Sequence, residues 1–126
     1  MTTSLYLRDL IAQTLGEVCQ VYPNEAPELA EYPYAVFNVQ TLTGDEIPKA
    51  GYLEVNVWDY YDTHSRAETI LDKIEAKIKN NYFASDRVAF RAFYGTRQHV
   101  EDADKNIKRI QEKFIIRWNE RGGNEQ

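Results

Sequence analysis

Two stretches of the chain repeat their hydrophobic residues every three or four positions, and this period constrains the fold more than any other feature. The stretches cover residues 4–18 and 65–79. Such a stripe predicts an amphipathic helix that buries one face. Ser65 and Glu68 form a capping-box pattern, which predicts where the second helix begins. The apolar stripe of the second helix consists of Ala67, Ile70, Leu71, Ile74 and Ile78.

The other ordered segments favour β-strands, because Val, Phe, Tyr and Thr are frequent in them and apolar residues alternate with polar ones. Residues 23–33 contain three prolines, and residues 43–51 contain Gly44, Pro48 and Gly51. Both segments are therefore expected to be loops, and the second joins the two strands of a hairpin. The predicted strands cover residues 19–22, 34–42, 52–60, 87–97 and 106–118.

The order of these elements, α-β-β-β-α-β-β, predicts an α+β domain with a mainly antiparallel sheet of about four or five strands and both helices on one face. We expect a single domain over residues 1–126, in which residues 119–126 form a flexible tail. Large aromatic side chains are expected on the face without helices, namely Tyr52, Trp58 and either Phe37 or Phe93. Because such side chains are poorly suited to water, this face favours an oligomer.

Charge is divided unevenly along the chain. The whole sequence has 15 basic and 20 acidic residues, a net charge of −5, which argues against nucleic-acid recognition and against binding to an anionic membrane. Residues 1–63 hold ten acids and two bases, a net charge of −8, whereas residues 64–126 hold ten acids and 13 bases, a net charge of +3. A chain divided in this way can pair its two sides head to tail with copies of itself.

Cys19 is the only cysteine, so an internal disulfide is excluded and a reduced, cytoplasmic setting is favoured. The sequence has no run of about 18 apolar residues that could span a membrane, and its start lacks the pattern of a secretory leader. No cofactor is expected, because phosphate-binding loops and dinucleotide fingerprints are missing.

Asp59, Asp62 and His64 lie within six residues where the second long strand ends, and a small metal-dependent enzyme could gather its ligands there. Ordinary roles at the end of a strand and the start of a helix explain these residues better. No enzyme is therefore predicted, and the metal-dependent enzyme is kept as an alternative.

Asp102, Asp104 and Asn106 match the start of a calcium-binding loop. The match then fails, because Ile107 and Lys113 occupy the positions of the required glycine and of the bidentate carboxylate. An acidic turn between the last two strands is expected instead.

Four short segments follow one another along the chain, namely Val21-Tyr22-Pro23, Tyr32-Pro33-Tyr34-Ala35-Val36-Phe37, the strand from Leu53 to Asp62, and Phe114-Ile115-Ile116-Arg117-Trp118. In this order, over about residues 5–118, they resemble the tail-completion proteins of long-tailed bacteriophages and prophages, a family of tail terminators and head-tail joining proteins. Compared with that family, the loop at residues 45–50 and the connection at residues 100–105 are short.

This resemblance implies a structural virion protein that forms a ring, usually a hexamer, at the head-proximal end of a long tail. The ring ends polymerisation of the tail tube and offers a surface for the head. The implied partners are other copies of the chain, the tail-tube protein and a head connector or stopper, first in the host cytoplasm and then in the virion. A head-completion or stopper protein of the neck is the alternative. We expect the contacts at Asp45, Glu46, Lys49, Tyr52, Trp58, Phe93, Arg109, Lys113 and Arg117.

Overall fold

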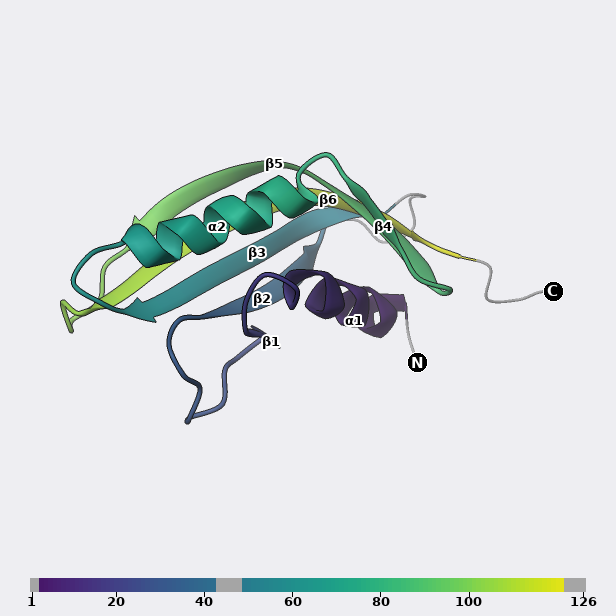
Figure 1. Ribbon diagram of the computed structural model, residues 1–126. Coiled ribbons are helices and arrows are strands. Elements are labelled where there is room, and N and C mark those ends of the chain that lie inside the picture. Colours follow the sequence, from purple (N-terminus) through teal and green to yellow (C-terminus); the bar gives the residue numbers. More distant parts are fainter. Residues whose placement is uncertain (1–2, 43–48, 122–126) are drawn as a thin grey trace.

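A six-stranded sheet with two helices forms the molecule (Figure 1) in the computed structural model, which describes residues 3–42 and 49–121. This is the predicted α+β fold, and its sheet has one short strand, β4, that the sequence pattern does not predict. The elements are α1 (Thr3–Leu15), β1 (Val21–Pro23), β2 (Tyr34–Thr41), β3 (Lys49–Tyr60), α2 (Ser65–Ile78), β4 (Tyr82–Ala84), β5 (Val88–Val100) and β6 (Ile107–Glu120).

The strands lie in the order β1-β2-β3-β6-β5-β4. All neighbours are antiparallel except β1 and β2, which run parallel. The longest pairing joins β3 to β6, from Lys49 opposite Trp118 to Tyr60 opposite Ile107. The last strand in the sequence therefore lies in the middle of the sheet, between β3 and β5.

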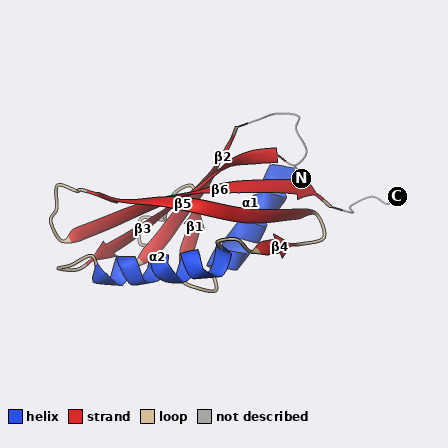
Figure 2. Cartoon of the chain, turned by 90° about the horizontal axis from the view of Figure 1, so that it is seen from above, coloured by secondary structure: helices blue, strands red, loops and turns tan. Residues whose placement is uncertain are grey.

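Both helices pack on the same face of the sheet, as predicted. Helix α2 contacts β3, β6 and β5, and α1 contacts β1 and β5; Figure 2 shows α2 along one side of the sheet. Alternate strand residues point toward the helices and form one hydrophobic core with them. Phe37 is fully buried in this core, whereas Phe93, next to buried Ala92 on β5, is only half-buried. The largest buried side chains are Phe37, Phe90, Phe114, Leu7, Ile11, Leu15, Leu53, Leu71, Ile74, Ile78, Ile110 and Ile116.

Helix α2 begins without the predicted capping box. Its N-cap residue is His64, which makes no side-chain cap hydrogen bond, and the backbone N–H of Ser65 donates to the hydroxyl of Thr63 at 3.3 Å. Glu68 pairs instead with Arg97 and His99 on β5. The charged partners on the neighbouring strand hold this carboxylate more strongly than a solvated backbone N–H would.

Several boundaries differ from the sequence expectation by a few residues. Helix α1 ends at Leu15, β3 begins at Lys49 and β5 continues to Val100. At the end of the chain, β6 runs to Glu120, so part of the predicted tail is strand. Each extended strand gains ladder hydrogen bonds from its neighbour, which local sequence patterns do not encode.

Candidate interaction surface

The face of the sheet opposite the helices, which we call the uncovered face, is where most of the predicted contact residues gather. Side chains of this face alternate along β3 and β6 with the buried residues of the core. The predicted contact residues on it are Tyr52, Trp58, Phe93, Arg109, Lys113 and Arg117. Lys49 shares its alternation with buried Leu53 and so belongs to the helix side. Asp45 and Glu46 lie outside the described residues.

Two cations of the uncovered face are engaged by aromatic rings of the same face. The guanidinium carbon of Arg109 lies 4.8 Å from the centroid of the Trp58 ring, and Arg109 Nε donates to Asn56 Oδ1 at 3.0 Å. Lys113 Nζ lies 5.1 Å from the centroid of the Tyr52 ring. Cation–π contacts at exposed sites stabilise by about 0.5–1 kcal/mol each. Arg109 and Lys113 therefore take part in the packing of their own sheet.

Arg91 and Arg117 form a second, unneutralised pair of cations. They are directly opposite each other on β5 and β6, and both are exposed. Among the residues that the structure describes, neither forms an ion pair. Like charges in this arrangement repel each other. An acidic group from outside the sheet would relieve this repulsion.

Apolar side chains surround these two arginines. Tyr82 on β4 is opposite Arg91 and is 58% exposed, and Ile115, 40% exposed, is opposite Tyr52. Phe93 is half-buried at the irregularity between Ala92 and Gly95 of β5. Arg91 and Tyr82 are not predicted from the sequence, because their place beside Arg117 depends on strand register. We call the following residues the arginine patch: Tyr52, Tyr82, Arg91, Phe93, Ile115 and Arg117.

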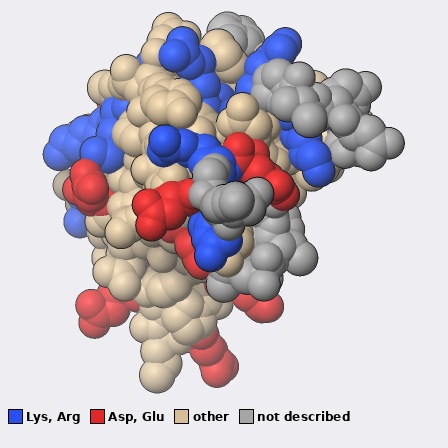
Figure 3. Space-filling view, turned by 90° about the vertical axis from the view of Figure 1, so that its right-hand side faces the viewer, with Lys and Arg blue, Asp and Glu red and all other residues tan. Residues whose placement is uncertain are grey.

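The opposite end of the molecule is acidic. Residues 24–33, between β1 and β2, form a loop that we call the acidic loop; it has three exposed glutamates, Glu25, Glu28 and Glu31, and no basic residue. Leu29 at the same loop is 91% exposed. The loop is the lowest part of the molecule in Figure 1, and in Figure 3 acidic atoms mark this lower end while basic atoms predominate at the upper end. The uneven charge of the sequence thus becomes an uneven charge of the surface.

Tyrosine rings attach the acidic loop to the sheet. The ring centroid of Tyr32 lies 5.4 Å from that of Tyr34 and 6.0 Å from that of Tyr60. Tyr22 stacks edge-on against Tyr34 at 5.9 Å. Within the loop, the N–H of Ala30 donates to the carbonyl of Pro27 at 3.0 Å. The loop therefore has a defined base and an internal turn, and its glutamates project from a fixed support.

Arg97 occupies the centre of a cluster of carboxylates on the helix side of the sheet. Its Nε donates to Glu112 at 3.0 Å, its Nη1 to Glu68 at 2.5 Å and to Asp72 at 2.9 Å, and its Nη2 to Glu75 at 3.0 Å. Three of these acids come from α2, and Glu112, 1% exposed, comes from β6. The cluster ties α2 to the two strands beneath it and is not predicted from the sequence.

The ionisation of the Arg97 cluster is strongly perturbed. Burial and the hydrogen bond with Glu75 raise the pKa of Glu112 to about 7, against the opposing effect of Arg97. The hydrogen bond with Glu112 lowers the pKa of Glu75. Burial lowers the pKa of Arg97, but hydrogen bonds to Asp72 and Glu68 outweigh it, so the net shift is upward. The two glutamates therefore share a proton near neutral pH while the arginine stays charged.

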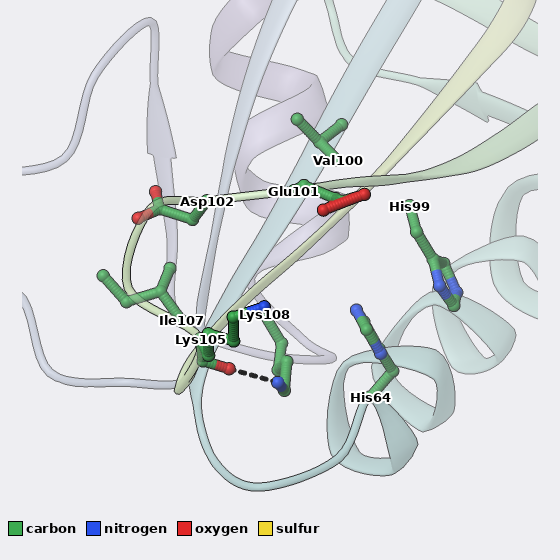
Figure 4. A pocket seen from close by; sticks show the side chains of 8 residues that line it. All are labelled: His64, His99, Val100, Glu101, Asp102, Lys105, Ile107 and Lys108. Atoms are coloured by element: carbon green, nitrogen blue, oxygen red, sulfur yellow. Dashed lines mark hydrogen bonds between the residues drawn. The ribbon is translucent and has the colours of Figure 1, made fainter.

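A surface pocket lies at the end of the β5–β6 hairpin beside the start of α2 (Figure 4). The rings of His64 and His99 stack there with centroids 4.1 Å apart, and His99 Nε2 lies 2.7 Å from a carboxylate oxygen of Glu68. Burial lowers the pKa of His64, and His99 and Lys108 lower it further. Lys108 donates to the carbonyl of Lys105 in the same pocket. The pocket thus mixes opposite charges around a stacked pair of rings.

The structure gives Asp59 a partner other than a metal ion. Its buried carboxylate accepts hydrogen bonds from Arg66 Nε at 3.0 Å and Nη2 at 2.7 Å, and from the N–H of Tyr60 at 2.8 Å. His64 stacks on His99, and Asp62 is exposed. Over residues 3–42 and 49–121, no group of three or more His, Cys, Asp or Glu side chains could hold a metal ion. These residues therefore do not form the site that the alternative enzyme requires.

Other features noted in the sequence have structural roles. The Asp102 carboxylate accepts from the N–H of Asp104, and the Asp104 carboxylate from the N–H of Asn106, both at 2.9 Å, as in ordinary acidic turns. Cys19 packs against the core, and burial raises the pKa of its thiol to about 11. In the described part of the chain, no helix is long and apolar enough to cross a membrane.

Comparison with known proteins reveals similarity in structure. No protein-family model matches the sequence, and no curated protein matches it. Among solved structures, the chain is similar to one from the virion of a native gene transfer agent particle, with a TM-score of 0.55 and 16% sequence identity. The similarity covers 94% of this chain and 91% of that chain. The two chains therefore share a fold over nearly their whole length.

Proposed function

We propose that this chain is a structural virion protein, without enzymatic activity, that forms a ring at the head-proximal end of a long phage-like tail. The ring ends polymerisation of the tail tube and provides the surface to which the head is joined. The observation that carries the proposal is the shared fold with a chain of a gene transfer agent virion over 94% of the sequence. The sequence resemblance to tail-completion proteins supports the same role.

The surface of the molecule also suits a ring. A closed ring is built from heterologous contacts, in which two different and complementary patches of each subunit meet. The uncovered face is basic and aromatic, whereas the acidic loop carries three glutamates and an exposed leucine. The partners in this role are other copies of the chain, the tail-tube protein and a head connector or stopper, with assembly in the host cytoplasm.

Deletion of the gene from a strain that produces the particles tests the proposal, with electron microscopy of the products. A tail terminator is required to stop tube growth, so we expect overlong tail tubes that are not joined to heads, and heads without tails. Re-expression of the wild-type chain from a plasmid should restore tails of uniform length.

Two other outcomes would contradict the proposal. Tails of normal length beside unjoined heads would indicate a head-completion or stopper protein of the neck. Complete particles made without the chain would show that it has no structural role in the virion.

A further inference from the structure

The acidic loop and the arginine patch complement each other in charge. Glu28 and Glu31 flank the exposed Leu29, and within the described residues neither carboxylate has an ion-pair partner. Arg91 and Arg117 likewise lack an acidic partner in the described part of the chain. Most other cations near them are engaged, as Arg109 and Lys113 are by aromatic rings. The unneutralised charges of the two surfaces are therefore of opposite sign.

The two surfaces also match in apolar content. Leu29 is 91% exposed, the largest exposed fraction among the large hydrophobic side chains described. Tyr82 and Ile115, 58% and 40% exposed, lie beside the two arginines. The loop thus presents a leucine between two acidic side chains, and the patch presents apolar side chains beside two basic ones.

Within one subunit these surfaces lie apart. The acidic loop leads from β1 to β2 at one edge of the sheet, whereas the arginine patch covers β3, β6, β5 and β4 toward the other edge. Figure 1 shows the loop at the lower end of the molecule with β5 and β6 above it, and Figure 3 shows acidic atoms at that lower end. Two patches on opposite sides of one subunit are what a heterologous contact requires.

We propose that the acidic loop of one subunit docks on the arginine patch of the next, with Glu28 and Glu31 pairing with Arg91 and Arg117 and Leu29 packing beside Ile115. The occupant of the arginine patch is thus a second copy of this chain. This inference rests on the proposed ring and names the contact that closes it. It adds six residues to those predicted from the sequence, namely Glu28, Leu29, Glu31, Tyr82, Arg91 and Ile115.

Electrostatic contacts of this kind determine orientation and weaken as salt is added. Burial of the Leu29 side chain adds a hydrophobic contribution to the binding free energy, which salt does not screen. On dilution we therefore expect the ring to dissociate at a higher protein concentration in 1 M NaCl than in 50 mM NaCl. Truncation of Leu29 should weaken assembly at both salt concentrations.

The first experiment measures assembly mass by sedimentation velocity at fixed subunit concentration and low salt. The loop variant is Glu28→Lys/Glu31→Lys, and the patch variant is Arg91→Glu/Arg117→Glu. In the loop variant both contact surfaces are basic, and in the patch variant both are acidic. Each variant alone should remain monomeric where the wild-type chain forms rings.

The second experiment mixes the two variants in equal amounts. The basic loop of the first variant can dock on the acidic patch of the second, and the acidic loop of the second on the basic patch of the first. Assembly of the wild-type mass should therefore return in the mixture only. Leu29→Ser should raise the subunit concentration needed for half-assembly by about tenfold.

Controls separate the contact from general effects of charge and folding. Asp9→Lys/Glu101→Lys changes the net charge as much as the loop variant, at exposed residues outside both surfaces, and should still assemble. Circular dichroism and urea midpoints confirm that each variant is folded.

The failures of the docking contact and of the ring are distinguishable. If the wild-type chain forms rings and both double variants keep that mass, the docking contact is wrong and the ring stands. If both variants are monomeric but their mixture does not assemble, the pairing of loop with patch is wrong. A wild-type chain that stays monomeric at high concentration and low salt overturns the ring and the docking contact together.

Discussion

Arg66 donates to both carboxylate oxygens of Asp59, and through this pair the first turn of α2 is tied to the end of β3. The Asp59 carboxylate is fully buried, whereas the Arg66 side chain is 45% exposed. The two residues are therefore not equivalent: loss of the arginine leaves an unpaired buried charge, whereas loss of the aspartate leaves an unpaired charge that water can solvate.

Arg66→Gln should therefore destabilise the fold by about 3–5 kcal/mol, the range for a buried charge that loses its partner. The measurement is urea unfolding at one fixed subunit concentration. Asp62→Asn, an exposed carboxylate on the same connection, is the control and should change the free energy of unfolding by less than about 0.5 kcal/mol. Equal effects of the two substitutions would show that the Arg66–Asp59 pair has no special role.

Arg97→Lys should destabilise the fold by about 1–3 kcal/mol, because a lysine ammonium cannot reach four carboxylates from α2 and β6 at once. The acids left unpaired include Glu112, which is 1% exposed. Thermal unfolding measures the loss, and Arg8→Lys on α1 is the matched control, since Arg8 has no ion pair within the described residues. A lysine that preserves the melting temperature would mean that the cluster needs only one positive charge.

Glu112 makes the stability of the fold depend on pH near neutrality. Its pKa is raised from 4.5 to about 7, so in this range the folded state binds a proton that the unfolded state has lost. The stability contributed by this proton is complete below pH 4.5 and is lost as the pH rises through about 7. The lowered pKa of Glu75 acts in the opposite direction at lower pH, below its ordinary value of 4.5.

Glu112→Gln removes this titration while it keeps the size of the side chain. As the pH rises from 5 to 8, wild type should lose stability that the variant keeps. The free energy of unfolding of the variant minus that of wild type should therefore increase by about 1–3 kcal/mol over this range. Urea unfolding at four pH values in this range measures the shift. Glu101→Gln, on the exposed turn after β5, is the control, and its free energy of unfolding should change with pH as that of wild type does. If the free energy of Glu112→Gln changed with pH in the same way as wild type, the shared proton would be contradicted.

Gly51→Ala should destabilise the β2–β3 hairpin by about 2 kcal/mol or more, because overpacking against backbone cannot relax by a rotamer change. A Cβ at this position would meet the carbonyl oxygen of Gln40 and would lie 3.2 Å from the Cα of Thr41. Ala50→Gly at the adjacent strand position should cost about 1 kcal/mol or less. The urea midpoints of the two variants measure the difference. Similar losses of stability in both would show that the hairpin accommodates the added Cβ.

The elements with a strong hydrophobic period were predictable from the sequence. Helix α2 and the buried faces of β3 and β6 follow directly from their spacing. Strand β4, Tyr82–Ala84, has three residues and no period of its own, and it exists through its pairing with β5. Strand formation by short segments depends on a neighbour, which a local pattern does not contain.

The surfaces were only partly predictable, for a related reason. Alternation along β3 and β6 is enough to bring Tyr52, Trp58 and Arg117 to one face. That Arg91 is opposite Arg117, and that Arg97 is opposite Glu112 beneath α2, depends on the register between β5 and β6. Register is a property of paired strands, so neither charge cluster is visible in the sequence of one strand.

The central position of β6 has a consequence for biosynthesis. Each β3 residue of the long pairing meets a partner far later in the chain, as Lys49 does with Trp118. A nascent chain that stops short of β6 has no middle to its sheet, and its β2–β3 hairpin cannot complete a core. The uncovered face, which spans β3 and β6, does not exist in such a chain. A chain that ends before β6 therefore lacks the surface on which the proposed docking contact depends.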